Sequence, residues 1–249
     1  MIFYFSGTGN SKHVAEQIAF SLHEEISVIP CADIEEVYES IGLVFPVYAW
    51  GIPMIVDDFI RKLKSTKIAN LWVVLTCGDD IGFADKIVRK SLKKNAGKEV
   101  NSIFSVRMPN TYVCLPGFDI DSEKLANEKI KETDDRLPAI IDIIKRKEDV
   151  VDVYRGAFPF TKTYILRPLF NAFLVTDKYF KTNESCTACG KCVRICPLNN
   201  IEINHTTDSS PRWKGNCTGC LRCYHSCPQH AIHFGTMTTN KGQKKQFNQ

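Results

Sequence analysis

The chain has 249 residues, 44% of them hydrophobic and 24% charged, a composition that supports a packed core and excludes a largely disordered protein. Its apolar runs are shorter than the roughly 18 residues that a membrane-spanning helix needs, so we expect no transmembrane segment. The formal net charge is only +4, and the sequence contains no block of like charges. Both observations argue against a nucleic-acid partner.

The first 147 residues alternate apolar strands with amphipathic helices. Short apolar runs predict five strands, at residues 1–5, 26–29, 41–46, 71–76 and 100–106. Apolar residues at helical spacing predict helices at residues 10–22, 55–63, 83–95 and 121–147. Pro138 is expected to kink or break the last of these helices. The alternation predicts an α/β fold with a five-stranded, doubly wound parallel sheet, whose ligand binds beyond the carboxyl ends of the strands.

The first predicted strand is followed by the loop SGTGNS, residues 6–11, which opens the first helix. The dinucleotide pattern G-x-G-x-x-G fails because Lys12 occupies its last position, and the P-loop pattern fails as well. Hydroxyl and amide side chains, flexible glycines and a helix N-terminus together suit one terminal phosphate group. We expect that phosphate to be bound by Ser6, Thr8, Asn10 and Ser11. The alternative is an ordinary turn with an N-cap residue.

Two more strand ends converge on the same edge of the sheet. One leads into PVYAWG, residues 46–51, and the other into TCGDDIGFAD, residues 76–85. Together with SGTGNS, these loops resemble the phosphate loop and the two flavin-sandwiching loops of flavodoxins, and the resemblance covers residues 1–147. It implies bound FMN, with Trp50 on one ring face and Phe83 on the other, although both rings could also be ordinary core residues. The expected FMN-binding residues are Ser6, Thr8, Gly9, Asn10, Ser11, Tyr48, Ala49, Trp50, Gly51, Thr76, Cys77, Gly78, Asp79 and Phe83.

A connector at residues 148–181 follows, within a stretch that is too rich in aromatic side chains for a flexible tether. We expect it to be partly helical, with an amphipathic helix near Arg167–Tyr179 that packs the two halves together. Pro168 would fall in the first turn of that helix, where proline is tolerated. An amphipathic segment on a membrane surface is the alternative, favoured by Lys162, Arg167, Lys178 and Lys181.

Eight of the eleven cysteines lie between Cys186 and Cys227. No signal-peptide pattern accompanies them, which argues against a secreted disulfide scaffold and leads us to expect a cytoplasmic protein. CTACGKCVRICP and CTGCLRCYHSCP both follow C-x2-C-x2-C-x3-C-P, the bacterial pattern for 4Fe–4S clusters, in which the fourth cysteine binds the other cluster. One cluster is therefore expected on Cys186, Cys189, Cys192 and Cys227. The second is expected on Cys196, Cys217, Cys220 and Cys223.

Zinc is the alternative metal, but zinc sites usually combine two C-x2-C pairs rather than triplets followed by x3-C-P. The segment resembles the two-cluster bacterial ferredoxin domain over residues 182–236, which implies a small α+β domain at the C-terminal side. Residues 202–214 depart from that pattern and are expected to form a surface loop. Residues 237–249 lack an apolar period and are expected to be a disordered tail.

A flavin exchanges one or two electrons, whereas a 4Fe–4S cluster exchanges one. FMN and two clusters in one chain therefore predict electron transfer with redox partner proteins, as part of anaerobic metabolism. A second hypothesis is an FMN-dependent reductase of a small organic acceptor, in which Tyr48, Tyr112 and Cys114 could line a substrate space. A third is an oxygen- or redox-sensing interaction module. No catalytic residue is assigned, and the oligomeric state stays open.

Overall fold

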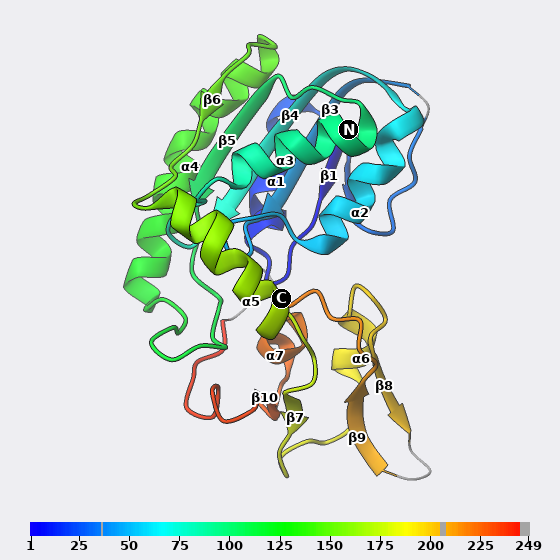
Figure 1. Ribbon diagram of the computed structural model, residues 1–249, viewed down its shortest axis with the longest axis vertical. Helices are drawn as coiled ribbons and strands as arrows, with labels where there is room; N and C mark the ends of the chain where they lie inside the picture. The colour runs from blue at the N-terminus through cyan, green and yellow to red at the C-terminus, as the bar shows by residue number, and fades with distance from the viewer. Residues whose placement is uncertain (36, 205–207, 245–249) are drawn as a thin grey trace.

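A computed structural model describes residues 1–35, 37–204 and 208–244 of the chain, and Figure 1 shows two unequal halves joined by a helix. The larger half is built on a six-stranded sheet in the order β2-β1-β3-β4-β5-β6. Every neighbouring pair is parallel. The strands are β1 (Ile2–Tyr4), β2 (Ile26–Val28), β3 (Val37–Pro46), β4 (Lys67–Cys77), β5 (Ser102–Arg107) and β6 (Val151–Asp152).

Helices cover both faces of this sheet, as a doubly wound fold requires (Figure 1). One face carries α1 (Asn10–Leu22) and α4 (Glu123–Lys145). The other carries α2 (Met54–Lys62) and α3 (Ala84–Ser91). A short 3₁₀ turn, η1 (Leu63–Ser65), follows α2, and a π-helical turn, η2 (Leu92–Ala96), follows α3.

The two faces of the sheet are separated by the alternation of side chains along the central strand β4. Leu71, Val73 and Leu75 pack with the α2 and α3 layer, whereas Trp72 and Val74 pack with α1 and α4. Gly42 on β3 stands opposite Trp72, and a Cβ atom at Gly42 would collide with the indole ring. The buried tryptophan therefore requires glycine at this position.

The α/β fold predicted from the sequence is confirmed, with two differences. The sheet has a sixth strand, because β6 adds two residues, Val151 and Asp152, alongside β5. The helix α4 continues through Pro138 without the expected break. The order β2-β1-β3-β4-β5 reverses direction at β1 and β3, the point where doubly wound sheets bind their ligands.

The connector forms one helical stretch, π-helical in η3 (Thr161–Leu166) and α-helical in α5 (Arg167–Phe173). Pro168 lies in the first turn of α5, as expected. The helix ends at Phe173, earlier than the expected boundary at Tyr179. In the text below, "connector helix" means η3 and α5 together.

The smaller half holds the cysteine-rich segment, whose elements are short. Strand β7 (Phe180–Thr182) pairs antiparallel with β10 (Ile232–Phe234). Between them lie α6 (Lys191–Ile195), β8 (Ile201–Asn204), β9 (Asp208–Trp213) and α7 (Arg222–Ser226). The stretch expected to be a surface loop is instead the β8–β9 hairpin, although residues 205–207 lie outside the described residues.

Two segments outside the cysteine-rich stretch complete this half. Val113 and Cys114, from the loop after β5, belong to its buried core. Residues 237–244, which the sequence places in a disordered tail, contact the rest of the molecule: the Tyr224 hydroxyl donates to the Lys241 carbonyl at 3.1 Å. The Gly242 amide donates to Asp119 Oδ1 at 3.0 Å. Residues 245–249 lie outside the described residues.

Candidate functional site: an interdomain cavity and two cysteine-lined cavities

A cavity of about 320 Å³ lies beyond the carboxyl ends of β3 and β4, between the two halves. This volume is within the range of small-molecule sites. The larger half supplies the loops after its strands, the connector supplies Lys162 and Phe170, and the smaller half supplies residues 218–221. The cavity therefore exists only because the two halves are packed together.

The structure brings only part of the predicted FMN set to this cavity. The residues that line it are Asn10, Tyr48, Ala49, Trp50, Thr76, Cys77, Gly78 and Asp79. The remaining predicted residues, Ser6, Thr8, Gly9, Ser11, Gly51 and Phe83, are not among the lining residues. The residues that line the cavity come mainly from the loops after β3 and β4. Most of the others come from residues 6–11, called the phosphate-type loop below.

The phosphate-type loop lies directly beside the cavity and is held by its own polar groups. The Gly9 amide donates to Ser6 Oγ at 3.0 Å, and the Ser11 and Thr76 hydroxyls are 2.8 Å apart. Gly9 has a positive φ of 98°, so glycine suits the turn that starts α1. Within the described residues 1–35, no side chain caps the N-terminus of α1, and the first turn of this helix holds no acidic residue. The helix terminus thus fits the phosphate of FMN.

Trp50 is presented to the cavity by a tight turn. The backbones of Tyr48 and Gly51 bond to each other in both directions, at 3.0 and 3.1 Å. Ala49 and Trp50 both have positive φ values, of 44° and 57°. A Cβ atom at Gly51 would collide with the guanidinium of Arg167. Gly51 is thus explained by the close approach of the connector helix.

Phe83 is not among the residues that line the cavity with Trp50, whereas the resemblance to flavodoxins implied that the two rings lie on opposite faces of FMN. The Phe83 ring packs 6.0 Å from that of Tyr164, and Lys86 Nζ lies 3.9 Å from its centre. Its amide donates to Thr163 Oγ1 at 2.8 Å. Phe83 therefore supports the connector helix rather than the cavity.

Aromatic side chains that the sequence prediction did not assign to FMN line the cavity instead. Tyr112 contacts Phe118 at 5.8 Å and Phe170 at 5.3 Å between ring centres, and all three line the cavity. Tyr112 and Phe170 are far apart in the sequence, and no local pattern links them. Their meeting depends on the connector folding back over the loop after β5.

Two buried hydroxyls in the cavity, Tyr112 Oη and Thr218 Oγ1, make no hydrogen bond within the described chain. Buried polar atoms are normally paired, so both fit a bound polar ligand such as a flavin. Burial, followed by the charges of Asp80 and Asp79, raises the pKa of the Cys77 thiol to about 12. Cys77 is thus a neutral thiol, and Asp80 is held by Lys162 at 2.5 Å.

The eight clustered cysteines surround two further cavities. One is lined by Cys186, Cys189, Cys192 and Cys227. The other is lined by Cys196, Cys217, Cys220 and Cys223. In the described residues, no three His, Cys, Asp or Glu side chains converge closely enough for a single metal ion. Each set encloses a space, and four thiols around a space fit the separate iron corners of a cubane cluster.

Backbone groups and burial shape the chemistry of these thiols. Cys196, Cys217 and Cys227 each accept a backbone N–H bond at Sγ, all at 3.3 Å. Burial raises the pKa of Cys217 to about 12 and that of Cys192 to about 11. Without iron the thiols of Cys192 and Cys217 therefore hold their protons, and cluster assembly must displace them.

The cysteine-rich half is locked onto the phosphate-type loop by Arg222. Its guanidinium donates to the Ser6 carbonyl and, at 3.2 Å, to the Gly7 carbonyl. A Cβ atom at Gly7 would stand 2.5 Å from the Cys220 carbonyl, so only glycine allows this approach. Arg222 could not be identified from the sequence, because its position between two cysteines carries no signal of a contact with residue 6.

A second link between the halves passes through His225 and Lys244. His225 Nε2 lies 2.8 Å from the Thr111 carbonyl, and its Nδ1 accepts from the Lys244 amide at 3.1 Å. Burial lowers the pKa of His225 to about 4, so the ring is neutral, donating at Nε2 and accepting at Nδ1. The Lys244 ammonium bonds to Asn10 Oδ1 at the phosphate-type loop.

Comparison with known families accounts for both halves. Residues 1–112 match the flavodoxin domain family, and residues 179–202 and 214–237 match two families of 4Fe–4S binding domains. Among solved structures, the Trp repressor binding protein from Bacillus subtilis is similar, with 15% identity and a TM-score of 0.38. That match covers 59% of this chain and 99% of the other. No curated protein matches.

These matches decide the choice of cofactors. A flavodoxin domain implies FMN, and two 4Fe–4S domains imply two clusters rather than zinc, which supports a role in electron transfer. Within the described residues, no helix is long and apolar enough to span a membrane. The chain is a flavodoxin domain followed by two 4Fe–4S binding segments, the arrangement of a flavodoxin/ferredoxin fusion.

Proposed function

We propose that the chain relays electrons between FMN in the interdomain cavity and an external redox protein, through the two clusters in a fixed order. The cluster on Cys196, Cys217, Cys220 and Cys223 is nearest the flavin, and the cluster on Cys186, Cys189, Cys192 and Cys227 is farther away. One observation carries this order. Thr218, Cys220 and Leu221 line both the interdomain cavity and the cavity of the nearer cysteine set.

Residues of the chain hold the two sites at short range. The Cys220 carbonyl lies against Gly7, and Arg222 clamps the carbonyls of the same loop from the neighbouring helix α7. Electron transfer slows steeply with distance, so this contact supports rapid exchange between the flavin site and the nearer cluster. The cofactors supply the redox chemistry, and the backbone N–H bonds to cysteine sulfurs help to set the cluster potentials.

The farther cysteine set lies nearer to solvent. Each set has one buried cysteine, Cys192 and Cys223, but only the farther set has an exposed one, Cys189. An external redox protein would therefore exchange electrons at the Cys189 side, remote from the flavin cavity. The order FMN, nearer cluster, farther cluster, partner follows from these two placements.

Single-turnover reduction of the reconstituted holoprotein tests the relay. A reduced two-cluster ferredoxin should reduce the bound FMN rapidly under anaerobic conditions, followed by flavin absorbance. Cys189→Ala should slow this reduction at least about tenfold per bound FMN, because the outer entry point is lost. Equal rates in the two proteins would contradict the proposed order.

The crossed ligand sets can be tested by iron and sulfide content per chain. Cys196→Ala combined with Cys220→Ala should remove only one cluster, because both residues belong to the nearer set. Cys196→Ala combined with Cys189→Ala should remove both clusters. If instead the second pair left one cluster and the first left none, Cys196 would bind with the Cys186 triplet.

A reductase of a small organic acceptor is the second candidate function, and it is favoured by the unpaired hydroxyls of Tyr112 and Thr218 in the cavity. They could orient a carbonyl or nitro group beside the flavin. Steady anaerobic turnover of NAD(P)H with such an acceptor would support this candidate. Reduction by iron–sulfur proteins alone, with no turnover of small acceptors, would support the relay.

A further inference from the structure

The connector helix exposes an unusually apolar side. Seven side chains on and just before it are between 43 and 79% exposed: Phe158, Phe160, Tyr164, Ile165, Leu166, Leu169 and Phe173. Helix α5 has no buried residue at all. A fully exposed aromatic side chain presents roughly 150–250 Å², so the seven together expose on the order of 800 Å². The largest apolar patch on a typical monomer is only about 300–600 Å².

The charged residues of this helix are turned away from that side. Lys162 reaches inward to Asp80 at 2.5 Å, and Arg167 is half-buried over Gly51. Between Phe158 and Phe173 the sequence holds no other charged residue. The exposed side is therefore apolar with only neutral polar interruptions, the reverse of an ordinary surface helix. From the sequence, an amphipathic helix that packs the two halves together was expected here, with a segment on a membrane surface as the alternative.

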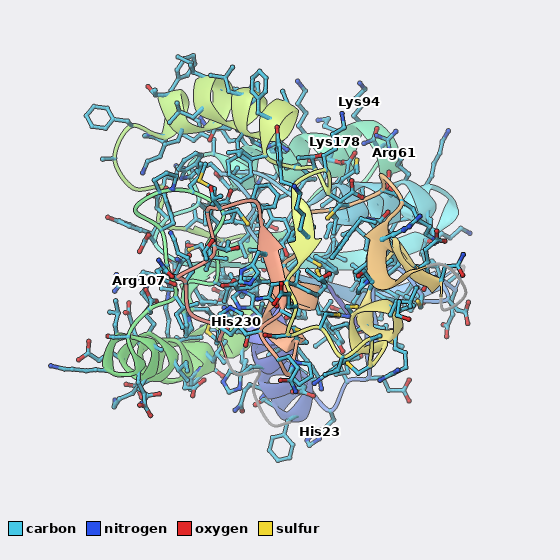
Figure 2. The ribbon with its side chains drawn as sticks, turned by 90° about the horizontal axis from the view of Figure 1, so that it is seen from below. His23, Arg61, Lys94, Arg107, Lys178 and His230 are labelled. Atoms are coloured by element: carbon cyan, nitrogen blue, oxygen red, sulfur yellow. The ribbon has the colours of Figure 1, made fainter. Side chains whose placement is uncertain are left out.

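A strongly basic segment lies beside the apolar side. Residues 84–96, which form α3 and η2, contain five lysines and arginines and one acidic residue. That acid, Asp85, is buried and paired with Arg155. The Phe83–Tyr164 contact joins the start of α3 to the connector helix. Figure 2 shows Lys94 on the same side of the molecule as that helix.

We propose that this side of the molecule binds an anionic lipid surface. The apolar side chains of the connector helix enter the boundary between headgroups and acyl chains, and the exposed Lys90 and Lys94 face the anionic headgroups, whereas Lys93 is paired with Glu99. An apolar helix side next to basic residues is the combination that interfacial binding requires. A second copy of the chain is a poorer occupant, because a twofold contact at this patch would bring two basic segments close together. The proposal is independent of the electron-transfer order above.

Co-sedimentation of the reconstituted holoprotein with lipid vesicles tests the proposal. Vesicles of equal parts phosphatidylglycerol and phosphatidylcholine should bind the protein, and vesicles of phosphatidylcholine alone should bind it at least about tenfold more weakly. Binding to the anionic vesicles should weaken with added salt, because the Debye length is only about 10 Å at 0.1 M salt. Visible absorption verifies that the cofactors are loaded in every sample.

Two double variants separate the apolar and the electrostatic contributions. Phe158→Ser with Phe173→Ser should weaken binding at least about tenfold, because both side chains lose their burial in lipid. Lys90→Glu with Lys94→Glu should weaken binding to anionic vesicles by a similar factor. Phe20→Ser is the matched control for the first variant, since Phe20 is 81% exposed on α1. Lys124→Glu, on the exposed start of α4, is the control for the second.

Three results would overturn the proposal. The first is no binding to the anionic vesicles. The second is an equal loss of binding in the Phe20→Ser control. The third is a lipid-free dimer, seen by sedimentation, that the Phe158→Ser and Phe173→Ser variant abolishes, because a second copy would then occupy this side. None of these results bears on the rate of flavin reduction by ferredoxin.

Discussion

The two halves of the molecule are stabilised in different ways. The flavodoxin half buries two extensive apolar layers, one on each side of its sheet. The smaller half has one modest core, and three of its members are the cysteines Cys114, Cys192 and Cys223. A small hydrophobic core rarely stabilises a domain without disulfide bonds or a bound metal. The first half is therefore expected to fold by hydrophobic burial, whereas the second depends on its clusters.

Loss of a cluster ligand should give the largest effect and the clearest separation of the halves. Cys223→Ser should raise amide hydrogen exchange in α6, α7, β7 and β10 at least about a hundredfold, since cluster binding supplies folding free energy there. Exchange in β1, β3, β4 and β5 should stay slow. Hydrogen-exchange mass spectrometry measures both, with Cys31→Ser, an exposed cysteine outside the sets, as the control. Equal loosening of the sheet would refute the comparison.

Overpacking the flavodoxin half should give the next largest effect. Gly42→Ala places a methyl group against the Trp72 ring, which should lower the free energy of unfolding of that half by about 3 kcal/mol. Urea unfolding followed by circular dichroism measures it. Gly97→Ala is the matched control, because a Cβ atom there meets nothing within 4 Å and costs only about 1–2 kcal/mol of left-handed strain. A smaller loss for Gly42→Ala than for Gly97→Ala would contradict the packing described.

The smallest effect concerns the contact between Lys244 and the phosphate-type loop. Burial lowers the pKa of Lys244 to about 7, while Asp121 raises it and His225 beside it is neutral. Without FMN, this buried amine destabilises the fold below pH 7, and the penalty fades as pH rises toward its ordinary pKa. A phosphate dianion favours the ammonium, so FMN binding above pH 7 should take up a proton.

FMN affinity should therefore fall between pH 7 and 9, by at most about tenfold per pH unit, which is the limit for one linked proton. Quenching of flavin fluorescence measures the affinity. Lys244→Gln should remove this pH dependence, while Lys12→Gln, an exposed lysine near the same helix terminus, should keep it. Riboflavin, which lacks the phosphate, should show no such dependence. If riboflavin followed the same curve, Lys244 would not act on the phosphate.

Much of the flavodoxin half could be predicted from the sequence because its signals are local. Helix α1 begins and ends at the expected residues, since its apolar spacing and its preceding glycine act within a few positions. The strand β6 was missed because two exposed residues carry no pattern, and they pair only through their place beside β5. Pro138 does not end α4, although proline disfavours a helix interior, because the helix packs on the sheet on both sides of this residue.

The site was less predictable where it depends on contacts between distant segments. The loops after β3 and β4 lie at the cavity as expected, because parallel strands end at one edge. Phe83 lies outside the cavity lining, and a loop position in the sequence does not say which way an aromatic ring turns. Tyr112 lines the cavity, where the sequence had suggested a substrate space. Phe170 and Arg222 acquire their roles only when the connector and α7 pack against the sheet edge, and no spacing rule records that.

The presence of Val113 and Cys114 inside the core of the smaller half has a consequence for engineering. These residues lie more than sixty positions before β7, on a loop that the sheet anchors. A ferredoxin unit excised at the connector would lack Val113 and Cys114 and would expose the apolar residues that they cover. Replacing either unit with a homologue would likewise require that the loop after β5 and the core that it enters be replaced together. The two units therefore share a core and cannot be exchanged independently of each other.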